Sequence, residues 1–330
     1  MYLIDGINAL KIEDLTFSDL NMKEDSIEEI LRQNIDMICN DEESLLLVGQ
    51  QVKNQIQARS DLIAVDQDGN LVLIELKRDK KDIEHRKEAL EFQAIRYAAS
   101  CATIQSTDEL IQNLFAPYVE KHREEFENKE LSSNEVARRM LETFLETNNV
   151  AKFNNRQRII LIASEFDEQT LSAVAWLNSN QVDISCYCLI PLKVDNHLLI
   201  HSQKILPIAD YEDFYIGIKD KASLGKAPKR DISRRSLPNI RSLLEWGVVS
   251  DGDIIVAKGR TDEATLTGDG KVITPNGPLS LQQWLKSIFG WSSVQTYAFA
   301  VQKSSGKTLF ELRQNYMENM ASEKENNALN

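Results

Sequence analysis

The sequence has no apolar stretch that approaches the ~20 residues needed to cross a bilayer, so we expect no membrane-spanning helix and no membrane partner. Its first residues, MYLIDGINALKIEDL, contain neither a basic region nor a long apolar core, and we expect no signal peptide. Cysteine is scarce. Only Cys186 and Cys188 are close together, and without a second ligand pair they make a poor zinc signal. We interpret the cysteines as free buried thiols, which fits a reducing cytoplasm.

Several common enzyme signatures are also missing. The chain contains no Walker A motif, no GxGxxG and no GxSxG, and its four histidines nowhere take HExxH spacing. These absences leave P-loop enzymes, dinucleotide-binding enzymes, α/β-hydrolases and zinc proteases without support from the sequence.

Positive charge is in short supply, because 38 lysines and arginines are outnumbered by 51 acidic residues and the net charge is −13. This balance argues against a protein coated in basic surface. It does not exclude nucleic-acid binding, which depends on where the positive charge lies. Between Gly217 and Arg241, eight basic residues accompany only two acidic ones. Four of these basic residues are predicted to bind DNA: Lys229, Arg230, Arg234 and Arg235.

The order of apolar patterns predicts an α/β fold with a mixed sheet flanked by helices over residues 1–215. A helix is expected to begin near Ser26, which forms a capping box with Glu29, although Asp25 is a rival cap. Further helices are predicted over 82–103, 108–148 and 170–178. Strands are predicted at 45–52, 60–66, 71–77, 158–164, 184–192 and 197–201, with weaker edge strands within 2–20.

The pattern changes after residue 215. Residues 216–239 contain glycine, two prolines and the basic cluster, and we interpret them as a basic linker. Residues 240–318 predict a small α+β domain, with a helix over 279–290 and a strand over 296–303. The polar residues 319–330 are expected to form a disordered tail.

The segment 59–80 holds the residues that can carry chemistry. Two apolar strands flank a turn, and a three-residue loop, 67–69, would put Gly69 where a positive φ is needed. In that register Asp61 lies directly opposite Glu75. A two-residue loop would turn the two carboxylates to opposite faces of the hairpin. The glycine position favours the first register.

This register is costly unless a cation is present. Directly opposed Cβ atoms lie ~5 Å apart, where like charges repel. Glu75 is embedded in an apolar run, and Lys77, two residues on, shares its face. Burial and a like-charged neighbour both raise the pKa of a carboxyl group, so one acid should be protonated unless a cation is bound. Two carboxylates and an ammonium on one face suit Mg²⁺ or Mn²⁺, with water and phosphate oxygens as further ligands.

Asp61, followed after thirteen residues by Glu75-Leu76-Lys77, resembles the PD-(D/E)xK nuclease superfamily, in particular its NucS-type and RecB-like branch. The resemblance spans about residues 24–100 and implies a restriction-endonuclease-like fold with a catalytic metal ion. Ser60 stands where the superfamily's name has a proline.

The flanking helices add to this resemblance. It implies that a glutamate of the upstream helix completes the metal site with Asp61 and Glu75, either Glu24 or, one turn on, Glu28. On the downstream helix, Gln93 and Tyr97 lie at i and i+4, and the resemblance places them beside the active site.

Residues 242–291 resemble the RAMA domain, a module associated with restriction and methylase proteins. The stretches SLLEWGVVSDGDIIVAKG, ATLTGDGKVI and LSLQQWLKSIFGW carry the likeness. The resemblance implies recognition of nucleic acid, including modified DNA.

The sequence therefore predicts a metal-dependent DNA endonuclease of the restriction or phage-defence kind. Two alternatives stay open: a non-catalytic DNA-binding or interaction protein, and a nuclease that acts on RNA or branched DNA. A homodimer is also left open. The predicted catalytic residues are Asp61, Glu75, Lys77, Gln93 and Tyr97.

Overall fold

The structure is a computed structural model that describes residues 2–12, 14–53, 59–85, 88–126, 129–194, 197–207, 237–275 and 277–328. The chain forms two compact units, which are described separately. The first comprises Met1–Leu206 with Gln282–Phe299, and the second comprises Pro207–Leu281 with Ala300–Asn330.

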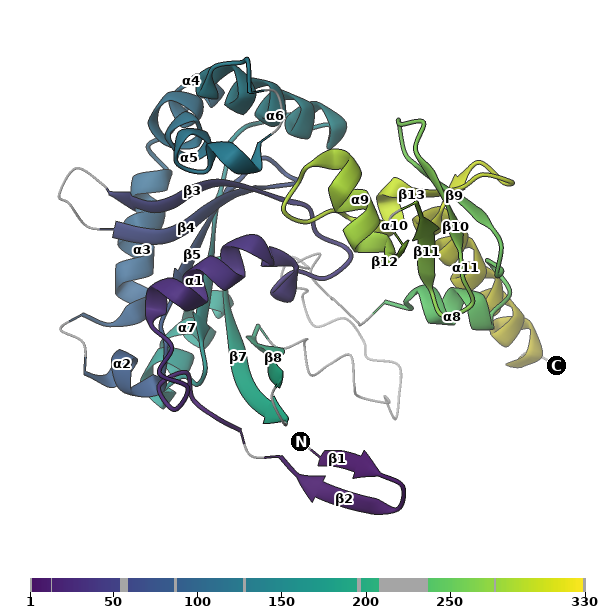
Figure 1. The fold of residues 1–330 in the computed structure, drawn as a ribbon, viewed down its shortest axis with the longest axis horizontal. Coiled ribbons are helices and arrows are strands. Elements are labelled where there is room, and N and C mark those ends of the chain that lie inside the picture. Colours follow the sequence, from purple (N-terminus) through teal and green to yellow (C-terminus); the bar gives the residue numbers. More distant parts are fainter. Residues whose placement is uncertain are drawn as a thin grey trace. The chain divides into compact units, whose positions relative to one another are not determined.

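The first unit is built on a six-stranded sheet. Its strands are β3 (Leu45–Lys53), β4 (Arg59–Asp66), β5 (Leu71–Leu76), β6 (Gln157–Ala163), β7 (Ile184–Val194) and β8 (His197–Leu206), side by side in that order (Figure 1). The first three form an antiparallel meander, β6 and β7 run parallel to β5, and β8 returns antiparallel to β7. The predicted mixed sheet is confirmed, as are the six strands predicted for it.

Helices occupy the connections and cover the sheet. The helix α1 (Glu24–Gln33) precedes β3 and passes in front of the sheet in Figure 1, whereas α3 (Leu90–Cys101) lies behind it. β4, β5 and β6 are almost fully buried between these layers, which puts the core of the unit at the centre of the sheet. The remaining helices are η1 (Ile35–Met37), α2 (Lys80–Glu84), α4 (Thr107–Leu110), a π-helical turn (Ile111–Phe115), α5 (Ala116–Lys121), η3 (Arg123–Glu125), α6 (Ser133–Thr147) and α7 (Glu168–Ser179).

The helix α1 begins three residues earlier than the predicted capping box implies. Its N-cap is Lys23, which makes no side-chain capping bond, and Ser26 lies inside the helix. The Glu29 carboxylate accepts hydrogen bonds from Arg32 and Gln33, at 2.6 and 2.8 Å. The predicted capping box is therefore wrong, as is the alternative cap Asp25, because the charge-assisted bond with Arg32 takes up the glutamate.

The N-terminal residues form a separate hairpin of β1 (Tyr2–Asp5) and β2 (Asn8–Lys11), which pair with each other. These are the short strands expected within 2–20, but they stand apart from the six-stranded sheet (Figure 1). Among the described residues, no helix combines the length and the apolar character that a membrane crossing requires.

The segment Gln282–Phe299 belongs to the first unit, although the sequence predicts it within the 240–318 domain. It contains α10 (Thr296–Phe299) and all of α9 (Leu281–Phe289) except its first residue. Ser293 exchanges backbone hydrogen bonds with Leu45, with N–O distances of 3.0 and 3.2 Å, and the Trp291 ring packs edge-on against Phe144 at 4.8 Å. These contacts add a short bridge to the start of β3, which explains the grouping.

The second unit holds a six-stranded antiparallel sheet, as the predicted α+β pattern requires. Its strands, in the order β12-β11-β10-β9-β13-β14, are β12 (Gly277–Ser280), β11 (Lys271–Thr274), β10 (Glu263–Leu266), β9 (Ile254–Ala257), β13 (Ala300–Gln302) and β14 (Lys307–Thr308). The helix α8 (Ile240–Glu245) precedes β9, and α11 (Leu309–Ala328) follows β14; the ring of Trp246, next to α8, stacks on Tyr316 of α11 at 4.5 Å.

One prediction for the C-terminal part is wrong. The strand predicted over 296–303 begins only at Ala300, because the preceding residues form α10. The helix α11 is drawn out to Ala328, and the disorder expected over residues 319–330 stays a prediction. Most of the predicted linker, including the four predicted DNA-binding residues, lies outside the described residues.

Candidate active site

The hairpin of β4 and β5 has the register that the glycine predicts. Leu62 pairs with Ile74, and Val65 pairs with Leu71. Gly69 has a φ of +80°, and its N–H donates to the carbonyl of Asp66 at 2.9 Å. The ladder of paired residues ends at Leu62, and continuing the same register by one residue would set Asp61 opposite Glu75. The three-residue loop and the register of the hairpin are therefore confirmed.

The two carboxylates have different surroundings. Glu75 is fully buried, as its apolar neighbours predict. Asp61 is half-buried, and its Oδ2 accepts a hydrogen bond from the backbone N–H of Leu76 at 2.7 Å. This bond fixes the Asp61 side chain against the end of β5. That strand pairs antiparallel with β4 on one side and parallel with β6 on the other.

The helix α1 brings both candidate glutamates to this place. Glu24 forms an ion pair with Lys77, whose side chain is buried. Glu28 is buried one turn further along and accepts a hydrogen bond from Gln51 Nε2 at 3.2 Å. Burial raises the pKa of Glu28, and the negative charge of Asp61 raises it further. Glu24 thus contacts Lys77, and Glu28 lies close enough to Asp61 for the two negative charges to repel each other.

Gln51 is a residue of this cluster that sequence reasoning missed. It has a φ of +55°, which is rare for a residue with a side chain, and it lies in β3 beyond the irregularity at Gly49. The unusual backbone accompanies the contact of its amide with Glu28. The only sign in the sequence is a pair of glutamines that interrupts an aliphatic strand.

The helix α3 supplies Gln93 and Tyr97, which the resemblance also placed beside the site. Gln93 Nε2 donates to the Tyr97 hydroxyl at 3.1 Å, so the two share one helix face, as their spacing predicts. Tyr97 lines a cavity of about 730 Å³, together with Ser60, Ile63 and Cys101. Asp61 lies two residues before Ile63 in β4, so the two side chains point to the same face of the sheet. The cavity thus adjoins the strand that carries the candidate aspartate.

A divalent metal is compatible with this donor set. Within the parts of the chain that the structure describes, no three carboxylate, imidazole or thiol groups gather closely enough to hold a metal by themselves. Mg²⁺ does not need such a cage, because it commonly takes one or two carboxylates and completes its shell with water and phosphate oxygens. Glu28 Oε1 is a buried carboxylate oxygen that has no hydrogen-bond partner among the described residues. The facing acids and this oxygen are hard ligands of the kind that Mg²⁺ prefers.

A scan against protein-family models gives no match, and a search of the curated proteins gives none either.

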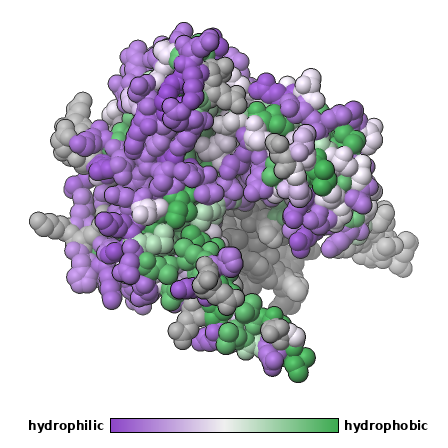
Figure 2. Space-filling view, viewed as in Figure 1, coloured by the Kyte–Doolittle hydropathy of each residue, from purple (hydrophilic) through white to green (hydrophobic). Residues whose placement is uncertain are grey.

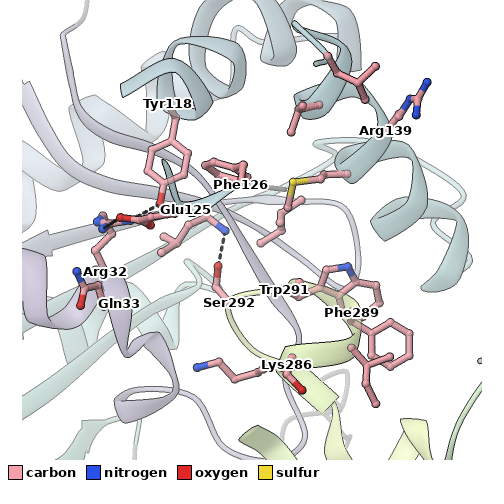
Figure 3. Close-up of a pocket in the computed structure, with 18 residues that line it drawn as sticks. Arg32, Gln33, Tyr118, Glu125, Phe126, Arg139, Lys286, Phe289, Trp291 and Ser292 are labelled. Atoms are coloured by element: carbon pink, nitrogen blue, oxygen red, sulfur yellow. Dashed lines mark hydrogen bonds and ion pairs between the residues drawn. The ribbon is translucent and has the colours of Figure 1, made fainter. Parts of the chain in front are cut away.

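A second cavity of about 700 Å³ lies elsewhere in the first unit (Figure 3). Arg32, Tyr118 and Glu125 line it on one side and Trp291 on another. Arg32 is buried and donates to Glu125 at 2.6 Å and to the Tyr118 hydroxyl at 3.1 Å. None of the predicted catalytic residues lines this cavity, so it is distinct from the candidate site.

Proposed function

We propose that the first unit is a metal-dependent nuclease with a restriction-endonuclease-like fold, and that its substrate is DNA. The observation that carries the proposal is the β4–β5 register, which sets Asp61 opposite Glu75 with Lys77 two residues on. Opposed carboxylates next to a buried lysine would be an unfavourable way to build a strand end for structural reasons alone. A role in binding a metal ion and a phosphate would explain why these three charged residues lie together.

Asp61 and Glu75 would hold a Mg²⁺ or Mn²⁺ ion, with a glutamate of α1 as a further ligand. When bound, such an ion polarises a phosphate and lowers the pKa of a coordinated water. Glu28 is the better placed of the two glutamates for this part, because it lies near Asp61 and Glu24 is paired with Lys77. Glu24 remains the alternative, since a substrate phosphate could take its place on the lysine.

Lys77 would stabilise the charge that develops on the scissile phosphate, and it cannot be a metal ligand while it is protonated. The ion pair with Glu24 holds its ammonium at the end of β5. Tyr97 and Gln93 would position the substrate from the α3 side through the hydroxyl and amide that now bond to each other. The cavity that Ile63 and Tyr97 line would give the substrate backbone access to this face of the sheet.

DNA is the proposed partner, with the basic segment and the second unit as the parts that bring it in. Lys229, Arg230, Arg234 and Arg235 supply positive charge in an otherwise acidic chain. Each phosphate contact that they make would add ~0.9 to the slope of log affinity against log salt concentration. The RAMA-like residues of the second unit would add recognition of the sequence or of a modification. A restriction or phage-defence role follows from this combination.

A substrate panel tests the proposal. Supercoiled plasmid, linear duplex, single-stranded DNA, branched DNA and RNA are each incubated with the full chain in Mg²⁺, Mn²⁺ or EDTA. Cleavage of DNA with either metal and none with EDTA is the expected result. Cleavage of RNA alone, or of branched DNA alone, would reassign the substrate. DNA binding without any cleavage would mean that the unit is a binding protein.

A further inference from the structure

The hairpin of β1 and β2 has no core of its own. A two-stranded hairpin by itself is marginally stable in water. Large apolar side chains lie on both of its faces and at its tip, and Figure 2 shows them gathered at the lower edge of that view. The exposed fractions are 62% for Tyr2, 41% for Leu3, 64% for Ile4, 101% for Ile7 and 66% for Leu10.

The edge strand β8 presents a matching surface. It pairs only with β7 among the described strands, so its other side is the edge of the six-stranded sheet. Leu198 and Leu199 of this strand are 43% and 45% exposed, on opposite faces. An edge strand also presents backbone N–H and C=O groups to a further strand. The strand can therefore accept both backbone pairing and apolar contacts.

The segment that follows the hairpin is attached to β7, the strand next to β8, on the side that faces away from β8. The N–H of Leu15 donates to the carbonyl of Pro191 at 3.0 Å, and Asp14 forms a bridge with Leu192. Both partners lie near the end of β7, just before the chain turns into β8. Within the described residues, the chain thus carries an apolar arm anchored one strand away from β8 and an edge strand with no second strand neighbour, two surfaces that a two-fold axis can make self-complementary.

We propose that two copies of the chain form a dimer by exchanging these hairpins, each one packing on β8 of the other copy. The inference does not depend on the proposed function. At roughly 100–200 Å² for each fully exposed large side chain, the five apolar residues of one arm carry on the order of 500 Å². Two arms and the two strands that receive them then reach the ~1,200–2,000 Å² of a stable interface.

Charge does not oppose this contact, despite the net charge of −13. Residues 197–206, HLLIHSQKIL, contain no acidic side chain. Residues 2–11 contain one acid and one base. The two surfaces are therefore close to neutral and suited to apolar burial.

The test measures the mass of the full chain in solution at micromolar concentration, by light scattering after size exclusion. The parent is expected at twice the 37.6 kDa of one chain. The arm variant Ile4→Asp/Leu10→Asp and the edge variant Leu198→Asp/Leu199→Asp are each expected to be monomers. Ile273→Asp, at a comparably exposed position of β11, is the matched control and is expected to remain a dimer.

Mixing the two monomeric variants separates exchange from other arrangements. The edge variant has an intact arm and the arm variant has an intact edge, so a mixed dimer with one exchanged hairpin is expected. A monomeric parent would overturn the proposal. So would an edge variant that stays dimeric, because the arms would then pair with each other. The arm substitutions lie at exposed positions outside the six-stranded sheet, so the arm variant is expected to fold. If the edge variant does not fold, the mass of the arm variant still tests the proposal.

Discussion

Lys77, directly after β5, and Glu24, at the first position of α1, form an ion pair that joins the helix to the candidate site. The lysine is buried and the glutamate is partly exposed. The pair therefore has one partner held by the core and one that, under the proposed function, a substrate phosphate would replace. This arrangement suits a group that must be fixed before the substrate arrives.

Lys77→Ala is expected to lower the rate of DNA cleavage by ~10²–10³-fold, because one donor to the developing charge is removed. Binding of Mg²⁺ or Mn²⁺, followed by calorimetry, should be retained, since the protonated lysine is not a ligand. The exposed Lys81 gives a matched control, and Lys81→Ala should cleave as the parent does. Cleavage at the parental rate by Lys77→Ala would remove the lysine from the mechanism.

Asp61→Asn is expected to fold at least as stably as the parent in EDTA while cleaving no DNA. The amide can still accept the bond from Leu76 N–H, and the repulsion between Asp61 and Glu28 is relieved. Mg²⁺ should raise the melting temperature of the parent and raise that of the variant less. A ligand at 100 times its Kd stabilises the state that binds it by about 2.7 kcal/mol. A parent that shows no metal-dependent shift, beside a clearly destabilised variant, would mean that the carboxylates are structural.

Asp66 is expected to make stability depend on pH. Burial raises the pKa of this carboxyl from 3.8 to about 6. The folded state therefore holds the proton more tightly than the unfolded state, and stability falls as pH rises from about 4 through about 6. The difference corresponds to about 3 kcal/mol.

Asp66→Asn should remove this pH dependence, because an amide does not titrate between pH 4 and pH 8. Its oxygen can still accept the bonds from the N–H groups of Asp68 and Asn70, so the turn is retained. Urea unfolding from pH 4 to pH 8 measures it, with the exposed Asp262→Asn as the control. The Asp66 variant should gain on the parent as pH rises. Parallel curves for parent and variant would contradict the expectation.

Arg158 and Glu43 form a buried ion pair, with an N–O distance of 3.3 Å and exposed fractions of 5% and 2%. Arg158→Met should destabilise the chain by ~3–5 kcal/mol, because it leaves a buried carboxylate without its counter-charge. The double variant Glu43→Gln/Arg158→Met should recover much of this loss. Urea unfolding of the three proteins checks the expectation, and equal losses in the single and double variants would show that packing, not charge, is responsible.

Local sequence signals predicted much of the sheet and the relative position of the two acids. Gly69 determined the loop length, and the loop length determined the register, because a slip of one residue would reverse every side chain. The runs of aliphatic residues likewise predicted the six strands of this sheet. Where a local pattern competed with a tertiary contact, the prediction was wrong: Glu29 is taken by Arg32 instead of capping the helix.

Contacts between distant parts of the chain could not be predicted in this way. The bridge between Ser293 and Leu45 joins segments almost 250 residues apart, and neither residue has an unusual local pattern. The burial of Glu28 against Gln51 depends on how α1 lies across the sheet. Helical spacing shows that Glu24 and Glu28 share a face, but not which of them meets the aspartate and which the lysine.

Nicking of supercoiled plasmid in Mg²⁺ tests the central claim most directly, with three proteins side by side: the parent, Glu75→Gln and Glu142→Gln. Glu142 lies on the exposed face of α6 and serves as the matched control. We predict that the parent and Glu142→Gln nick at similar rates and stop in EDTA, while Glu75→Gln is slower by at least ~100-fold, because losing a metal ligand costs several kcal/mol of transition-state stabilisation. Nicking by Glu75→Gln at the parental rate would contradict the account.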